Sequence, residues 1–299
     1  MSSTEPRAPR LLLAFILASL SCVLGASLPL FFGHGLDLPD DGLSSFSTWE
    51  GLQHSLNTGE TPLWVPGRLG GTSLYAEGMS MAPWYPSSLL LFIFPAAFAL
   101  PLAMSLHALG VWLAIFVLGR TYALRPFAAA FAATGVSLSP LISLVFIEVH
   151  ADAITCYLWF ALSLAAHRKT CLADSTKARL TCAGAFAACI GMLLLSSHFR
   201  FAAATCGALG LWVLLSRRHI VLLVGAMLVG VAAGAPGFLP LLLEIRLNAE
   251  DLNRLSVLAG PDHEPFTLWN LTGWMSPKPH WMSRDYSLGA VLGIAFLAG

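Results

Sequence analysis

The sequence predicts an all-α polytopic membrane protein. Of its 299 residues, 57% are hydrophobic and only 11% are charged, whereas soluble globular proteins carry roughly 25% charged residues. The long, unbroken apolar runs predict spanning helices, because strands of a transmembrane barrel would alternate in polarity. The 16 basic and 16 acidic residues cancel without a basic patch, which argues against a nucleic-acid partner. The composition thus excludes a soluble enzyme and a disordered chain.

Seven transmembrane helices and a truncated eighth account for the apolar runs, since a spanning helix needs about 20 apolar residues. The first run follows Arg7 and Arg10 and is too long for a cleaved signal peptide, so we expect a retained anchor. Pro95 and Pro101 divide the second uncharged stretch, 87–119, into a short interfacial piece at 88–94 and a helix. The expected helices are 11–32, 97–118, 126–147, 153–166, 180–197, 201–216, 220–243 and 286–299.

The last run, 286–299, is too short to cross a bilayer. We therefore expect that the sequence stops inside an eighth helix and is the N-terminal part of a longer protein. With the N-terminus in the cytoplasm, the inner segments hold ten of the 16 basic residues and two of the 16 acidic ones. This distribution follows the positive-inside rule. It leaves two large outer loops, 33–86 and 244–285.

The first outer loop carries adjacent carboxylates, Asp40 and Asp41, shortly after the first helix. Behind them, apolar residues recur at a spacing of three or four, which predicts one face of an amphipathic helix lying at the membrane interface. That face consists of Leu43, Phe46, Trp49, Leu52 and Leu56. Asp41 is a candidate catalytic residue, and the alternative is that it only caps the helix.

Two tight hairpins bring further polar residues to the same side of the membrane. Glu148, His150 and Asp152 lie between the third and fourth expected helices, at a depth where ionisable groups are costly and often functional. His198 and Arg200 lie between the fifth and sixth, and the guanidinium is suited to binding a phosphate. The alternatives are a solvated turn for the first group and snorkelling to headgroups for the second.

If these three groups converge, they provide carboxylates for base chemistry and a cationic pair for a departing phosphate. This combination suits group transfer from a lipid-linked phosphate donor. The outer carboxylates would also suit Mg²⁺ or Mn²⁺. No ligand spacing requires a metal, however, and the six cysteines show no metal-binding pattern. We therefore name no metal ligands and no certain cofactor.

The large loop and the later hairpins also carry a recognisable series of motifs. They are Asp40-Asp41, Gly59-Glu60-Thr61-Pro62-Leu63-Trp64, Gly70-Gly71-Thr72, Trp84-Tyr85-Pro86, Ser197-His198-Phe199-Arg200, and Phe238-Leu239-Pro240 through Glu244 and Arg246. In this order the chain resembles the YfhO family of bacterial membrane proteins, which is similar to the C-type (GT-C) glycosyltransferases. Relatives often have an amide at the position of Arg200.

The resemblance implies a multi-pass protein of the bacterial inner membrane that transfers a sugar from a polyprenyl-phosphate donor to a cell-envelope acceptor on the outer face. It also implies an acidic catalytic base in the first outer loop, which we assign to Asp41 with Asp40 beside it. His198 and Arg200 would bind the donor phosphate, and the other hairpin residues would assist.

Two other classes of function remain open from the sequence. A membrane transporter or lipid flippase places polar groups near the bilayer midplane. Apart from cysteines, the only ionisable residue expected deep in a span here is His107, and the pattern favours a packed, hydrogen-bonded histidine. A non-catalytic scaffold would dock its partner through the loop at 244–285. The tryptophans of that loop, Trp269, Trp274 and Trp281, are typical of an aromatic belt. The alternative is that they line a sugar or lipid groove.

Overall fold

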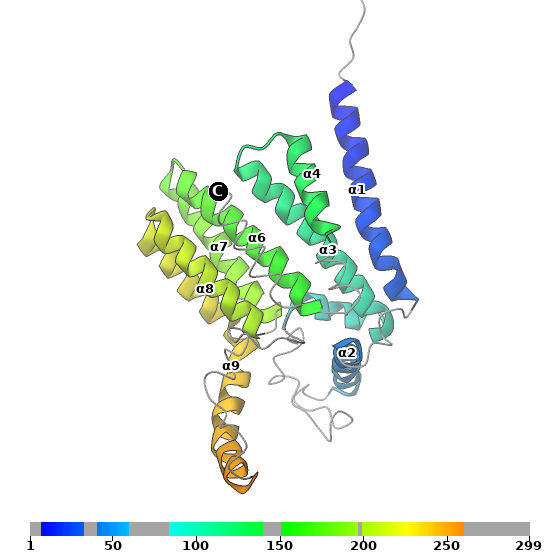
Figure 1. The fold of residues 1–299 in the computed structure, drawn as a ribbon, viewed down its shortest axis with the longest axis vertical. Helices are drawn as coiled ribbons and strands as arrows, with labels where there is room; N and C mark the ends of the chain where they lie inside the picture. Colours follow the sequence, from blue (N-terminus) through cyan, green and yellow to red (C-terminus); the bar gives the residue numbers. More distant parts are fainter. Residues whose placement is uncertain (1–6, 33–40, 60–83, 140–150, 197–198, 260–299) are drawn as a thin grey trace, which may run out of the picture. The chain divides into compact units, whose positions relative to one another are not determined.

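The computed structural model describes residues 7–32, 41–59, 84–139, 151–196 and 199–259 (Figure 1). These residues are helical throughout, joined by short turns, and contain no strand. The all-α class is therefore confirmed for the described part of the chain. The elements are α1 (Arg7–Phe31), α2 (Asp41–Thr58), the 3₁₀ helix η1 (Pro86–Phe92), α3 (Ala96–Thr121), α4 (Pro126–Ser137), α6 (Ala151–Leu172), α7 (Thr176–Ser196), α8 (Phe199–Ser216) and α9 (Ile220–Ala259).

Within the described ranges, four helical stretches are long and apolar enough to cross a membrane. They are Leu11–Phe31, Ala96–Thr121, Thr176–Ser196 and Ile220–Pro240. Two further apolar helices, Pro126–Ser137 and Phe201–Ser216, are shorter. These lengths and compositions are those of a multi-pass membrane protein. The expected last helix, 286–299, lies outside the described residues.

Several helix boundaries differ from the sequence-based expectation. Helix α4 ends at Ser137, where the sequence predicted a helix over 126–147. Helix α6 begins at Ala151 and continues to Leu172. It therefore includes residues 151–152 and 167–172, which the sequence assigned to the connections between helices. Helix α9 continues to Ala259, so residues 244–259 are helical where the sequence predicted the start of a loop. The stretch from 241 to 259 contains neither glycine nor proline, so nothing interrupts the helix there although it is polar. Residues 260–285 of that expected loop lie outside the described residues.

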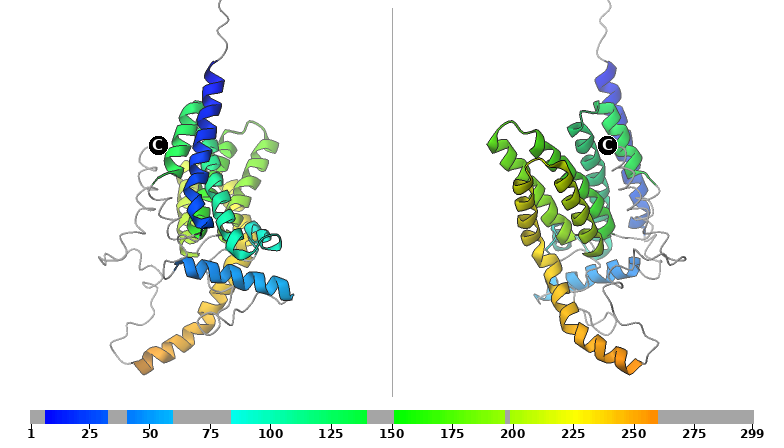
Figure 2. Two further views of the ribbon diagram at one scale, coloured as in Figure 1. Left: turned by 90° about the vertical axis from the view of Figure 1, so that its right-hand side faces the viewer. Right: turned by 60° about the vertical axis from the view of Figure 1, so that its left-hand side comes forward.

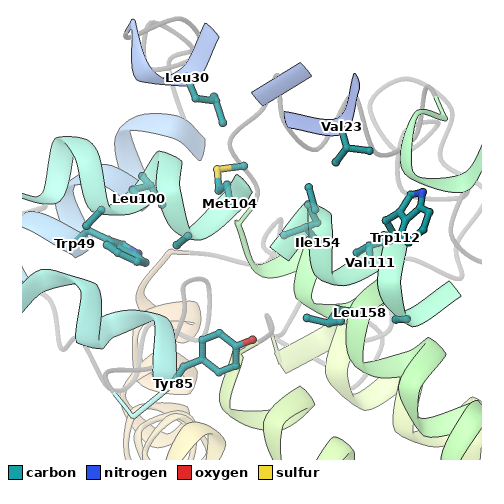
Figure 3. Close-up of a cluster of buried hydrophobic side chains, with 14 of the residues drawn as sticks. Val23, Leu30, Trp49, Tyr85, Leu100, Met104, Val111, Trp112, Ile154 and Leu158 are labelled. Atoms are coloured by element: carbon teal, nitrogen blue, oxygen red, sulfur yellow. The ribbon is translucent and has the colours of Figure 1, made fainter. Parts of the chain in front are cut away.

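The chain divides into two units, residues 1–241 and 242–299. In the first unit, α3 packs against α1, α2, α4 and α6, and α6 packs in turn against α7 and α8. Buried apolar side chains fill the space around α3, among them Val23, Leu100, Met104 and Ile154 (Figure 3). A second cluster around α7 includes Phe186 and Ile190. The second unit is described from Leu242 to Ala259, where it consists of the remainder of α9.

Polar side chains also join the helices of the first unit. The Ser105 hydroxyl of α3 donates to the Ser27 hydroxyl of α1 at 2.9 Å, and the Trp112 indole of α3 donates to the Thr134 hydroxyl of α4 at 3.1 Å. Such bonds are typical of transmembrane bundles, where helices gain little from burial of apolar surface and associate through packing and hydrogen bonds.

Small residues let α7 and α9 approach closely. A Cβ atom at Gly230 would lie 2.5 Å from the carbonyl oxygen of Ala187 and 2.7 Å from the Cβ of Ile190. At Gly234 it would lie 2.6 Å from the Cβ of Leu194. Real Cβ atoms do not approach other atoms so closely, so the contact requires glycine at both positions. The four-residue spacing of Gly230 and Gly234 is the small-residue motif of packed transmembrane helices.

Candidate functional site

Helix α2 provides the first wall of the candidate site. It begins at Asp41 and ends at Thr58, where Gly59 takes a left-handed φ of 70° that glycine adopts without strain. Trp49 and Leu52 are buried, and Phe46 and Leu56 pack partly buried against the same core. The apolar face predicted from the spacing is thus directed at the helix bundle, with α2 lying crosswise to α1 (Figure 2).

Gln53 fastens α2 to the beginning of α3. Its amide oxygen accepts a hydrogen bond from the backbone N–H of Ala96 at 3.0 Å. Its amide nitrogen donates to the carbonyl oxygen of Phe94 at 3.1 Å. Pro95 precedes α3 and provides no side-chain cap, so Gln53 caps this helix from another part of the chain. Gln53 does not belong to the apolar face predicted from the sequence.

The segment that precedes η1, which the sequence predicts to be the end of the first outer loop, enters the bundle through Tyr85. Its side chain is only 3% exposed and extends its hydroxyl into the interior (Figure 3). The hydroxyl lies 2.9 Å from Nε2 of His107 in α3 and accepts a hydrogen bond from the Trp159 indole of α6 at 3.0 Å. Burial raises the pKa of this hydroxyl, and hydrogen bonds from Trp159 and Ser196 oppose that increase.

A second polar contact on α6 holds the end of α7. The buried Thr155 hydroxyl donates to the carbonyl oxygen of Ser196 at 3.2 Å. Ser196 is the last residue of α7, and α8 begins at Phe199. Residue 155 therefore joins the first turns of α6 to the hairpin of α7 and α8.

The helix starts that carry the predicted site residues lie at one end of the first unit (Figure 1). Asp41 is the first residue of α2, Asp152 is the second residue of α6, and Arg200 is the second residue of α8. The structure does not describe these three side chains. The other predicted residues, Asp40, Glu148, His150 and His198, lie outside the described residues.

The backbone contributes positive charge at this end of the first unit. Helices α2, α6 and α8 all begin here, and a helix N-terminus presents free N–H groups and a partial positive charge. Such ends favour anions, whether a carboxylate or a phosphate. Within the described part of the chain, no group of three or more His, Cys, Asp and Glu side chains is arranged to hold a metal ion.

His107 of α3 is held by contacts within the bundle. Its Nδ1 atom faces the carbonyl oxygen of Ala103 one turn earlier in α3, and its ring stacks on Tyr85 with centroids 5.4 Å apart. Both ring nitrogens thus have hydrogen-bond partners within the bundle. The expectation of a packed, hydrogen-bonded histidine agrees with this geometry.

Comparison of the chain with protein-family models, with curated proteins and with solved structures finds no match.

Sequence reasoning missed the residues that hold the site together. Gln53, Thr155 and Trp159 belong to no motif, since each acts on a partner far away along the chain. Tyr85 had a signal, because Trp84-Tyr85-Pro86 was part of the quoted series. No sequence pattern, however, pairs this tyrosine with His107.

Proposed function

We propose that this chain is a membrane glycosyltransferase, or the N-terminal part of one. It would move a sugar from a polyprenyl-phosphate donor to a cell-envelope acceptor at the outer face of the bacterial inner membrane. The observation that supports this proposal is the common location of three helix starts, those of α2, α6 and α8. In sequence these starts carry two carboxylates and an arginine, and Thr155 near the start of α6 bonds Ser196 at the end of α7.

The proposed reaction needs one base and one group that stabilises the leaving phosphate. The Asp41 carboxylate takes the proton of the acceptor hydroxyl as its oxygen forms a bond to the anomeric carbon of the sugar. The bond from that carbon to the phosphate oxygen breaks, and polyprenyl phosphate leaves with the bonding electron pair. Arg200 and His198 neutralise the developing charge. Asp40 supports the base, and Glu148, His150 and Asp152 bind and orient the substrates.

The starts of α6 and α8 strengthen this assignment on physical grounds. The N–H groups of a helix N-terminus bind a phosphate more strongly where a guanidinium lies beside them. Arg200 belongs to the first turn of α8, so backbone and side chain would act on the same anion. The membrane lipid would hold the polyprenyl tail beside the bundle.

Replacement of the proposed base tests this function. The protein is reconstituted in liposomes with a labelled polyprenyl-phosphate sugar, and transfer to an acceptor is followed over time. We expect Asp41→Asn to lower transfer by about 100-fold or more, the usual contribution of a general base. Asp174→Asn is the matched control, because Asp174 is exposed in the turn after α6, and this variant should retain wild-type transfer.

Three results would contradict the proposal. Wild-type activity in Asp41→Asn would remove Asp41 from the mechanism. Movement of lipid or solute across the liposome membrane without any sugar donor would instead favour a transporter or flippase. A protein that binds a partner but neither transfers nor transports would be a scaffold. Chelation of divalent ions in the same assay decides whether Mg²⁺ or Mn²⁺ takes part.

A further inference from the structure

We infer that Tyr85 is a positioning residue of the site, and this inference rests on the function proposed above. Its hydroxyl fastens the end of the first outer loop to the face of α6 that carries residue 152. The residue itself need not touch a substrate. It would act by keeping the loop, α3 and α6 in one fixed arrangement.

The hydrogen bonds around the Tyr85 hydroxyl have a defined direction. The carbonyl oxygen of Ala103 only accepts, so Nδ1 of His107 must donate to it. In the neutral ring, Nε2 then accepts, and the Tyr85 hydroxyl donates to it over 2.9 Å. The Trp159 indole only donates, and it gives its proton to the Tyr85 oxygen over 3.0 Å. The hydroxyl therefore has a donor and an acceptor on two different helices.

Helical periodicity places the predicted carboxylate position on the same side of α6. Residues at i, i+3 and i+7 share one face of an α-helix, so positions 152, 155 and 159 form one stripe. Thr155 bonds the end of α7, and Trp159 bonds Tyr85. The stripe that begins at Asp152 thus joins the first outer loop to the hairpin that precedes Arg200.

The burial of this cluster leads us to expect a large effect from the loss of a single hydroxyl. Tyr85 is 3% exposed and His107 is 7% exposed, so water does not replace a lost partner. A polar atom left unpaired in such a place forces the surrounding segments to rearrange. Displacement of a catalytic group by about 1 Å is enough to lower a rate by about 100-fold.

Tyr85→Phe tests the inference because it removes only the hydroxyl. Hydrogen exchange of the η1 amides, measured by mass spectrometry, reports whether the end of the loop is still fastened. Sugar transfer in liposomes, analysed as separate kcat and KM values, reports whether the site is still positioned. We expect at least about tenfold faster exchange in η1 and a fall in kcat of about 10- to 100-fold, with a smaller change in donor KM.

Two further variants separate positioning from general damage. Trp159→Phe removes the indole donor but leaves the bond between Tyr85 and His107, so it should give the same pattern with smaller changes. Tyr122→Phe is the matched control, since Tyr122 lies at the other end of α3 and uses its ring under the Arg168 guanidinium. This control should match wild type in exchange and in transfer.

The inference is overturned if Tyr85→Phe leaves exchange in η1 unchanged, or if exchange rises while kcat stays at the wild-type value. The failure of the proposed function looks different, because wild-type protein would then transfer no sugar at all. The exchange measurement would still decide whether Tyr85 fastens the loop to α6.

Discussion

The side-chain oxygen of Gln53 accepts a hydrogen bond from the backbone N–H of Ala96, 43 residues later in the chain, at 3.0 Å. This contact replaces the cap that a serine or aspartate before α3 would otherwise supply. It also connects a helix in the first outer loop with a helix that is long and apolar enough to span the membrane. Together with the buried side chains of Trp49 and Leu52, it holds α2 against the bundle.

Gln53→Ala should reduce the stability of the bundle by about 1 kcal/mol, the usual cost of a lost helix cap. Gln53→Glu keeps the oxygen that accepts from the Ala96 N–H but loses the donor to the Phe94 carbonyl oxygen. Its loss of stability should therefore differ from that of Gln53→Ala. Denaturant unfolding in detergent, followed by circular dichroism, measures both values. Equal stability of Gln53→Ala and wild type would show that the contact contributes nothing.

The close approach of α7 and α9 predicts that alanine has different effects on stability at two glycines of α9. Gly230→Ala places a methyl group 2.5 Å from the Ala187 carbonyl oxygen, and overpacking of this kind costs about 1–3 kcal/mol. Gly225→Ala has nothing within 4 Å of its new methyl group and should be neutral or slightly stabilising. Thermal unfolding of the two variants side by side tests this, and equal loss in both would contradict the packing.

The hydrogen bonds of His107 fix which ring nitrogen carries the proton. Because the Ala103 carbonyl oxygen faces Nδ1, we expect the Nδ1–H tautomer, with Nε2 accepting from Tyr85. The nitrogen-15 chemical shifts of selectively labelled histidine distinguish the two tautomers. In Tyr85→Phe the Nε2 shift should move toward that of a free acceptor. An Nε2–H signal in wild type would refute the direction of the hydrogen bonds described above.

The Tyr85 hydroxyl also predicts a pH dependence of stability. Burial raises its pKa above the ordinary value of 10.0, so the neutral form is favoured in the folded state. Above the ordinary pKa the unfolded chain releases this proton and the folded chain keeps it. Stability therefore falls as pH rises, by up to about 1.4 kcal/mol per pH unit.

Phe at position 85 has no proton to release. The stability advantage of wild type over Tyr85→Phe should thus be constant in neutral solution and should shrink above about pH 10. Denaturant unfolding of both proteins at several alkaline pH values measures this difference. A stability difference between the two proteins that stays constant into strongly alkaline solution would mean that the Tyr85 pKa is not raised.

The sequence was sufficient for the helical class and for several helix starts, because these follow from local rules. Pro126 begins α4 as expected, since proline suits the first helical position. The period of Trp49 and Leu52 predicted a buried face, and both side chains are buried. The end of α9 was not predictable in the same way, because polar residues such as Glu244 and Arg246 are compatible with a loop and with an exposed helix.

The internal contacts of the site were beyond sequence reasoning for a physical reason. Thr155 and Ser196, like Gln53 and Phe94, are separated by 41 residues, and no local periodicity connects such pairs. Tyr85 and His107 are closer in sequence, but their contact depends on how η1 turns the chain into α3. The roles of Asp41, Asp152 and Arg200 remain predictions for the experiments above.

The link between Gln53 and Ala96 has a consequence for how the protein is made. Helix α2 leaves the ribosome before α3 exists, so its amide has no carbonyl or N–H partner until the later segment is synthesised. The amino end of α3 likewise lacks its cap until α2 has packed beside it. Placement of the earlier helix and of the later one are therefore coupled steps of biogenesis.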